Sequence, residues 1–201
     1  MISGKYVDVS VYQKSKKGNH FCGDSYFFVE EDQIFLGVLA DGLGSGEIAK
    51  ESSQAVIDIV NQHKYKTVKE IIELCNKRLI GMRGAVMGIL KIDFIQQTFT
   101  FSSIGNIGII VLENGVKKKR NIPSSGYLGS RYRGVKVMTE KLSEGTNFIV
   151  FSDGVMDKEL SQYFFKDYNV DRITEAYARY SDNIRQDDTT LLAIRYKGEK
   201  G

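Results

Sequence analysis

Two apolar segments of this sequence end in the same way, and they limit the folds that the chain can adopt. Residues 34–40 run into Asp41-Gly42, and residues 147–152 run into Asp153-Gly154. A nearly unbroken apolar run of this length predicts a strand that is buried on both faces. Helical sequence, not a returning strand, follows each Asp-Gly, so the common hairpin explanation of this dipeptide fits poorly. Each segment therefore places a carboxylate at the exit of a buried strand.

Strand patterning dominates the rest of the chain. The sequence predicts strands near residues 7–11, 25–29, 34–40, 84–92, 98–104, 108–112, 116–121, 135–140, 147–151 and 189–196. Asn114-Gly115 between two of them is a strong signal for a tight hairpin. Many consecutive strands with helices early and late in the chain indicate an α+β sandwich, with antiparallel sheets at the centre and helices outside.

Helices are expected in four places. Apolar residues at three- and four-residue spacing predict an amphipathic helix after Gly46. Thr67 and Glu70 have the spacing of a capping box, which predicts a second helix through about residue 79. A short helix is expected after Gly154, and Asn169 can cap a last helix through about residue 180.

Length and composition bound the class of protein. The 201 residues include one proline and no linker-like stretch, which predicts a single domain over residues 1–201. A formal charge of +3 is too weak to indicate nucleic-acid binding. No apolar run is long enough to span a membrane, and no signal peptide is recognisable. With Cys22 and Cys75 as the only thiols, we expect a cytoplasmic protein with reduced cysteines.

Two further aspartates share the strand-boundary position. Asp24 opens the strand near residue 25, and Asp187 immediately precedes the last strand. Taken singly, each is an ordinary polar flank of a strand. Together with Asp41 and Asp153, they could meet at one end of the sheets, and a buried carboxylate needs a compensating positive charge. An all-oxygen set of ligands favours Mg²⁺ or Mn²⁺ over Zn²⁺.

Nucleophilic catalysis by a side chain is not indicated. The chain has two histidines, His20 and His63, and neither has motif spacing to a serine or to an Asp-Gly. His63 is expected at a helix end, where a histidine is favourable. Cys22 lies two residues from Asp24, and a neighbouring carboxylate disfavours the reactive thiolate.

At these residues the sequence resembles the metal-dependent protein phosphatase family, in its bacterial sporulation and stress branch. The pieces that match, in the order of the family, are residues 22–26, 40–46, 83–85, 103–106, 125–129, 151–154 and 186–190. They span nearly the whole chain, and the ordered set is specific although no single piece is. The chain is most similar to free-standing phosphatases that carry no sensor domain and act in stressosome feedback.

The resemblance implies a four-layer α-β-β-α sandwich with two Mn²⁺ or Mg²⁺ ions at one end of the sheets. Carried over, Asp41 would bridge both ions and the Gly42 carbonyl would bind one. Asp153 and Asp187 would hold the other, and Asp24 would bind directly or through water. Asp41 and Asp153 are then the catalytic residues, acting through a metal-activated water that attacks phosphorus in line.

The resemblance also implies partners and a reaction. Phosphoserine and phosphothreonine on stressosome scaffold or anti-sigma-factor-antagonist proteins would be hydrolysed, as negative feedback in a general stress response. A monomer that binds neither nucleic acid nor membrane is expected.

Two positions depart from the family pattern. Eukaryotic members have a Glu where this chain has Gly23, and a phosphate-gripping Arg where it has Asn19. Phosphate binding would then depend more on the metals, on Lys14, Lys16 or Lys17, or on another residue.

Alternatives remain open at this point. The missing Glu and Arg would permit a catalytically weak phosphatase-like domain that only binds a partner. Residues 42–46 resemble a dinucleotide-binding turn, although their glycine spacing does not match one. Residues 125–129 could line the substrate entrance, but an ordinary loop is favoured.

Overall fold

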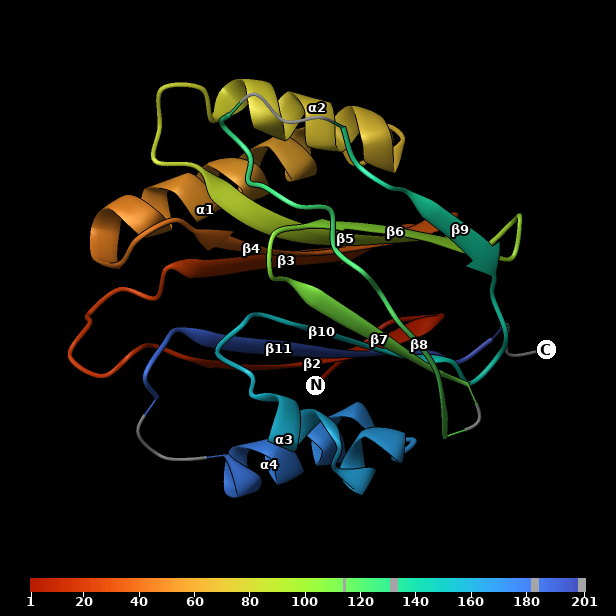
Figure 1. Ribbon diagram of the computed structural model, residues 1–201. Helices are drawn as coiled ribbons and strands as arrows, with labels where there is room; N and C mark the ends of the chain where they lie inside the picture. The colour runs from red at the N-terminus through yellow and green to blue at the C-terminus, as the bar shows by residue number, and fades with distance from the viewer. Residues whose placement is uncertain (114, 131–133, 182–184, 199–201) are drawn as a thin grey trace.

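Two antiparallel sheets stacked face to face form the centre of the molecule, and helices cover both outer faces (Figure 1). This computed structural model describes residues 1–113, 115–130, 134–181 and 185–198. In spatial order, the first sheet contains β1 (Ile2–Ser3), β2 (Val7–Lys14), β11 (Thr189–Tyr196), β10 (Asn147–Phe151), β7 (Gly108–Glu113) and β8 (Val116–Arg120). The second contains β3 (Asp24–Glu30), β4 (Ile34–Gly42), β5 (Ala85–Asp93), β6 (Thr98–Ile104) and β9 (Met138–Lys141).

The helices form the two outer layers. α1 (Gly46–Gln62) and α2 (Val68–Arg78) cover the second sheet, and α3 (Asp157–Leu160), the 3₁₀ helix η1 (Tyr163–Lys166) and α4 (Val170–Tyr180) cover the first (Figure 1). The expected four-layer α-β-β-α sandwich is therefore confirmed. None of the helices in the described ranges combines the length and the apolarity that a bilayer crossing requires.

Local signals read from the sequence determine the helix starts. Thr67 Oγ1 accepts a hydrogen bond from the Glu70 amide, and the Glu70 carboxylate accepts one from the Thr67 amide, which confirms the capping box. Asn169 Oδ1 accepts from the amides of Asp171 and Arg172, as expected of a helix cap.

Some boundaries differ from the expectation. The strand expected over residues 135–140 begins only at Met138, and the short β1 and η1 were not predicted. The predicted hairpin between β7 and β8 is confirmed by their antiparallel pairing, although Asn114 of its turn lies outside the described residues.

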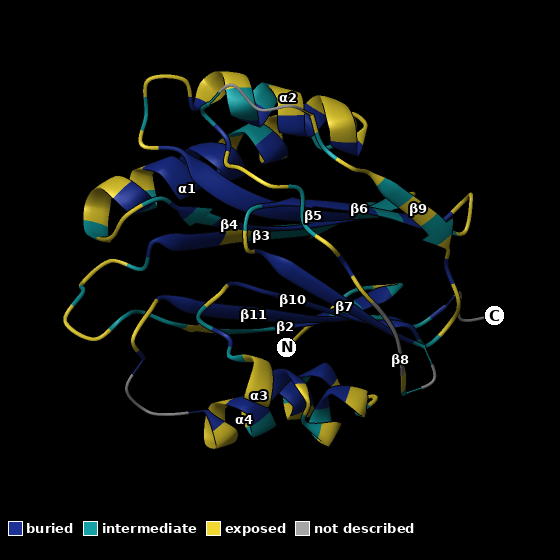
Figure 2. Cartoon of the chain, viewed as in Figure 1, coloured by how far each residue is buried: buried dark blue, intermediate teal, exposed yellow. Residues whose placement is uncertain are grey.

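Three apolar clusters separate the four layers. Alternate residues of β4 divide between two of them: Phe35 and Leu39 pack between the sheets, whereas Leu36 and Val38 pack under α1 and α2. A third cluster joins β10 and β11 to η1 and α4. Figure 2 shows both central sheets as largely buried. β4 is thus buried on both faces, as its apolar sequence predicts.

The topology rules out the dinucleotide-binding interpretation of residues 42–46. α1 leads into α2, and the next strand, β5, pairs antiparallel with β4. A Rossmann turn requires a parallel βαβ unit at this point. The glycines after Asp41 therefore need another explanation.

Candidate metal centre

The four aspartates singled out from the sequence come from two strand ends on each sheet. Asp24 opens β3 and is the register partner of Asp41 near the end of β4. On the other sheet, Asp153 follows β10, and Asp187 precedes β11, which pairs with β10. The turns before β3 and before β11 lie at the same end of the two sheets, at the left in Figure 1. Antiparallel pairing thus brings remote stretches of chain to one edge.

Asp24 is the most deeply buried of these carboxylates, with 0% of the residue exposed. Its Oδ2 accepts hydrogen bonds from Ser152 Oγ at 2.8 Å and from Thr190 Oγ1 at 2.7 Å, both on the facing sheet. No described residue donates to its Oδ1. Burial raises the pKa of Asp24 to about 6, although the two hydroxyl donors act in the opposite direction. A buried carboxylate oxygen without a donor is a ready ligand for a cation.

Asp41 is repelled by the other members of a cluster of five aspartates, Asp24, Asp41, Asp153, Asp187 and Asp188, which we call the acidic group. Burial raises its pKa to about 8, and negative charge adds to the effect, in decreasing order, from Asp24, Asp153, Asp187 and Asp188. Carboxylates directly opposite each other on paired strands are destabilising. This end of the sheets is thus strongly attractive to cations.

Asp153 reaches the protein surface and has one side-chain donor. Asn106, in the turn after β6, donates from Nδ2 to Asp153 Oδ2 at 2.5 Å. Desolvation and the neighbouring Asp187 raise the pKa of Asp153, whereas the Asn106 hydrogen bond lowers it. Asn106 is not among the candidate site residues predicted from the sequence. Its signal was its place in the family-like piece 103–106.

Asp188 is a fifth carboxylate that sequence reasoning did not assign. It is buried, and it accepts hydrogen bonds from the amides of Lys16 and Gly23 at 2.8 and 2.7 Å. A Cβ added at Gly23 would lie 2.9 Å from the Asp188 carboxylate and 3.9 Å from Oδ1 of Asp41. The Asp188 carboxylate thus already borders the space into which the side chain of a Glu at position 23 would project.

The glycines after Asp41 are required for different structural reasons. A Cβ at Gly42 would lie 1.8 Å from the carbonyl oxygen of Ala49, so Gly42 is needed because the α1 backbone packs directly on it. Gly44 and Gly46 have φ values of +103° and +71°, which favour glycine.

One ammonium group lies next to the acidic group. Lys50 on α1 donates from Nζ to the carbonyl oxygen of Asp24 at 3.1 Å and to Ser25 Oγ at 2.9 Å. Both acceptors are neutral, so Lys50 contributes positive charge here without pairing with a carboxylate. Two donated hydrogen bonds hold its ammonium in this position.

A buried ion pair braces the two turns that present Asp153 and Asp187. Arg185 Nη1 lies 3.1 Å from Glu159 Oε1 of α3, and 3.4 Å from the carbonyl oxygen of Gly154. Arg185 Nη2 donates to the Tyr177 hydroxyl at 2.8 Å. The Arg185 and Glu159 side chains are 3% and 1% exposed. This network connects α3 and α4 to the chain entering β11.

The donor set fits a hard divalent cation, because it consists of oxygens and includes an unpaired buried carboxylate oxygen. As the side chains stand, no three His, Cys, Asp or Glu groups in the described ranges converge closely enough to hold one ion. Mutual repulsion of five carboxylates opposes such convergence.

Neither cysteine is suited to nucleophilic chemistry. Burial, reinforced by the charges of Asp24 and Asp188, raises the pKa of Cys22 to about 12. Burial also raises the pKa of Cys75 to about 12. Both thiols are free. The expectation that Cys22 is a poor nucleophile is confirmed.

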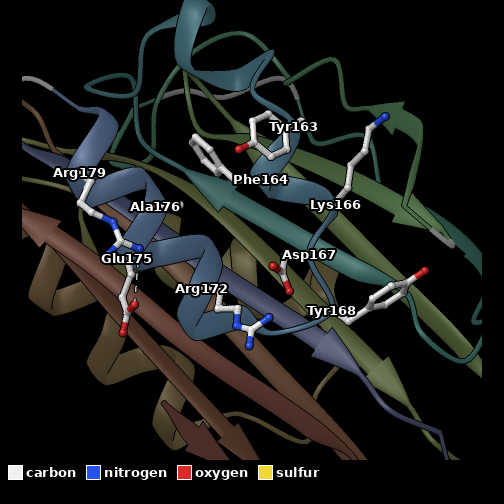
Figure 3. A pocket seen from close by; sticks show the side chains of 9 residues that line it. All are labelled: Tyr163, Phe164, Lys166, Asp167, Tyr168, Arg172, Glu175, Ala176 and Arg179. Carbon is white, nitrogen blue, oxygen red and sulfur yellow. Dashed lines mark ion pairs between the residues drawn. The ribbon is translucent and has the colours of Figure 1, made fainter.

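A surface hollow of about 750 Å³ has none of the candidate metal-binding aspartates in its lining. Figure 3 shows it on the outer face of η1 and α4, where Tyr168 and Arg172 are among the lining residues. None of its lining residues is a candidate site residue predicted from the sequence.

Comparison with known proteins places these features in a family. The profile of the stage II sporulation protein E (SpoIIE) family matches residues 32–197. Phosphoserine phosphatase RsbX of Bacillus subtilis (strain 168) is 35% identical over 188 residues, 94% of each chain. A crystal structure of RsbX in complex with magnesium has a TM-score of 0.88 at 34% identity and 98% coverage of both chains. A structure of the PP2C phosphatase domain and a fragment of the regulatory domain of Bacillus subtilis SpoIIE has a TM-score of 0.82 at 20% identity, covering 97% of this chain and 64% of that one.

Proposed function

The chain belongs to the stage II sporulation protein E (SpoIIE) family, and on this premise we propose that it is a metal-dependent protein serine/threonine phosphatase. RsbX, which matches along nearly its whole length, is a phosphoserine phosphatase and was crystallised with magnesium. The observation in this chain that carries the proposal is the buried Asp24 carboxylate, which has one oxygen without a donor beside four other aspartates.

The metal ligands that we propose are Asp24, Asp41, the Gly42 carbonyl, Asp153 and Asp187, holding two Mg²⁺ or Mn²⁺ ions. When bound, such ions lower the pKa of water and neutralise phosphoryl oxygens. The chain's own contribution is to position the carboxylates at one edge of the sandwich, where the raised pKa values of Asp24 and Asp41 mean that a bound cation would favour their ionised forms.

Three neighbouring side chains position these carboxylates by donating hydrogen bonds to them. The hydroxyls of Ser152 and Thr190 fix one oxygen of Asp24, and its other oxygen, buried and without a donor among the described residues, is left for a cation. Asn106 fixes one oxygen of Asp153 in the same way. Because these donors are set by the fold before substrate arrives, little reorganisation is needed during the reaction.

For substrates, we propose phosphoserine and phosphothreonine side chains of stressosome or anti-sigma-factor-antagonist proteins. Similarity to RsbX supports this class, and we further propose a feedback role for a cytoplasmic monomer. The free thiols of Cys22 and Cys75 suit a reducing compartment.

The decisive experiment is hydrolysis of a phosphoserine peptide by the purified protein, with excess Mn²⁺, with excess Mg²⁺ and with chelator. We expect phosphate release in both metals and none with chelator. Absence of release in excess Mn²⁺ would instead support the alternative of a partner-binding module. Incubation with phosphorylated stressosome scaffolds would then identify the protein substrate.

A further inference from the structure

Arg83 lies against Gly44, in the loop that follows Asp41 and Gly42, and its guanidinium has no partner among the described residues. The side chain is exposed, and it makes no ion pair or hydrogen bond within the described residues. A Cβ added at Gly44 would lie 3.5 Å from Arg83 Nε and 3.8 Å from Nη2. The guanidinium therefore rests against the loop that follows Asp41 and Gly42.

The backbone that carries Arg83 is fixed on two sides. On one side, the Leu43 amide donates to the Gly84 carbonyl at 3.0 Å. On the other, Ala85 and Leu128 exchange both backbone hydrogen bonds, at 3.2 and 2.8 Å. A rigid base of this kind reduces the entropy lost when the arginine binds a ligand.

The Tyr127 ring packs against the backbone that carries Arg83. Gly84 has a φ of +96°, and a Cβ there would lie 2.8 Å from Cδ2 of the Tyr127 ring. The ring is thus packed on the Gly84 backbone, next to Arg83, and Tyr127 remains 41% exposed. The loop of residues 125–129 is therefore a neighbour of the candidate centre rather than a remote connection.

We propose that Arg83 binds the phosphoryl oxygens of the substrate, which supplies the cation that Asn19 does not. The inference rests on the proposed function and adds a substrate-binding residue to it. A phosphate ester that approaches five carboxylates needs positive charge beyond them, and the Lys50 ammonium is already committed to Asp24 and Ser25. The planar guanidinium can donate two parallel hydrogen bonds to phosphate.

The test compares Arg83→Ala, Arg83→Lys and a matched control, Arg172→Ala, which removes an exposed arginine on α4 in the opposite helical layer. With Mn²⁺ saturating, we expect Arg83→Ala to lower kcat/KM on a phosphoserine peptide about tenfold to hundredfold. Arg83→Lys should recover part of the loss, and Arg172→Ala should match the wild type. Mn²⁺ affinity, measured by titration calorimetry, should stay unchanged in all three.

Binding of inorganic phosphate to the Mg²⁺-loaded protein separates this inference from the proposed function. Weaker phosphate binding by Arg83→Ala supports the inference even if the wild type has no turnover, in which case only the proposed function fails. If Arg83→Ala binds phosphate and substrate as tightly as the wild type, with unchanged KM, the inference is overturned. Turnover by the wild type would still support the proposed function. In that case Lys16 and Lys17, in the loop after β2, are the next candidates.

Discussion

Asp41 is the register partner of Asp24 across the antiparallel pair β3 and β4, so two carboxylates lie on opposite positions of neighbouring strands at the edge of the sandwich. Cross-strand pairs normally stabilise a sheet, but like charges in this position destabilise it. Hydrogen bonds from the facing sheet satisfy one oxygen of Asp24. The rest of the repulsion remains, and a divalent cation between the strands would remove it.

Replacing one member of this pair should therefore separate activity from stability. We expect Asp41→Asn to reduce phosphatase activity at least about a hundredfold, because a proposed bridging ligand is lost. The metal-free protein should become more stable, by about 1–3 kcal/mol after allowance for solvent screening, because a carboxylate of raised pKa is removed. Initial rates with Mn²⁺ and thermal unfolding with chelator measure the two effects.

The control for that substitution is Asp32→Asn, in the exposed turn at the other end of the same strand pair. It should leave both quantities unchanged. Near wild-type turnover by Asp41→Asn would refute the proposed mechanism. Asp153→Asn is expected to lose activity in the same way.

The metal-free protein should lose stability as the pH rises. The pKa of Asp24 is raised to about 6 and that of Asp41 to about 8, both above the ordinary value near 3.8. The folded state therefore holds more protons than the unfolded state between about pH 4 and pH 8, so the free energy of unfolding falls across this window. Saturating Mn²⁺ should reverse the trend, because ion binding requires the ionised carboxylates.

Thermal unfolding at pH 5, 6, 7 and 8, with chelator and with Mn²⁺, measures this dependence. A melting temperature that is independent of pH in the presence of chelator would contradict the proposed electrostatics. So would a rise in melting temperature with pH under the same condition.

The hydroxyl of Thr190 should control the acid side of the activity profile. Its hydrogen bond to Asp24 lowers the pKa of that carboxyl, so Thr190→Val should raise it and shift the acid limb of the rate profile to higher pH. For Thr190→Val we expect the ratio of the activity at pH 6 to the activity at pH 8 to be lower than that of the wild type by about threefold or more. Thr100→Val on β6, where the hydroxyl bonds Thr139 instead, is the matched control and should leave the profile unchanged.

Breaking the buried ion pair should weaken the fold. Arg185→Met leaves the Glu159 carboxylate buried without its partner, which costs about 3–5 kcal/mol of unfolding free energy. The double variant Arg185→Met, Glu159→Gln should recover part of that loss. Urea denaturation of the two single variants and the double variant forms a thermodynamic cycle, and additive losses would show that the pair is not coupled.

Much of the architecture could be predicted because its signals are local. The Thr67 capping box and the Asn169 cap lie within one turn of helix, and the apolar run of residues 34–40 indicates a central strand without knowledge of its neighbours. The expected strand at residues 135–140 was placed too early, because edge strands carry a weak alternation signal. β9 is such an edge strand.

The surroundings of the aspartates could be predicted only in part. Their positions at strand boundaries identified Asp24, Asp41, Asp153 and Asp187 as candidates. No sequence pattern indicated that Asp188 accepts the amide of Gly23, or that Ser152 and Thr190 reach Asp24 from the facing sheet. Those contacts join residues as many as 166 positions apart, and they depend on strand register and on how the two sheets stack.

The sequence by itself determined which segments are strands and helices and which of them end in a carboxylate, because periodicity and capping act over a few residues. Only the tertiary structure decided that those carboxylates share one edge, that one oxygen of Asp24 has no donor among the described residues, and that Arg83 lies against the loop after Asp41. The physical reason is that charge repulsion, burial and cross-sheet hydrogen bonds depend on distances in space, which the order of residues does not specify.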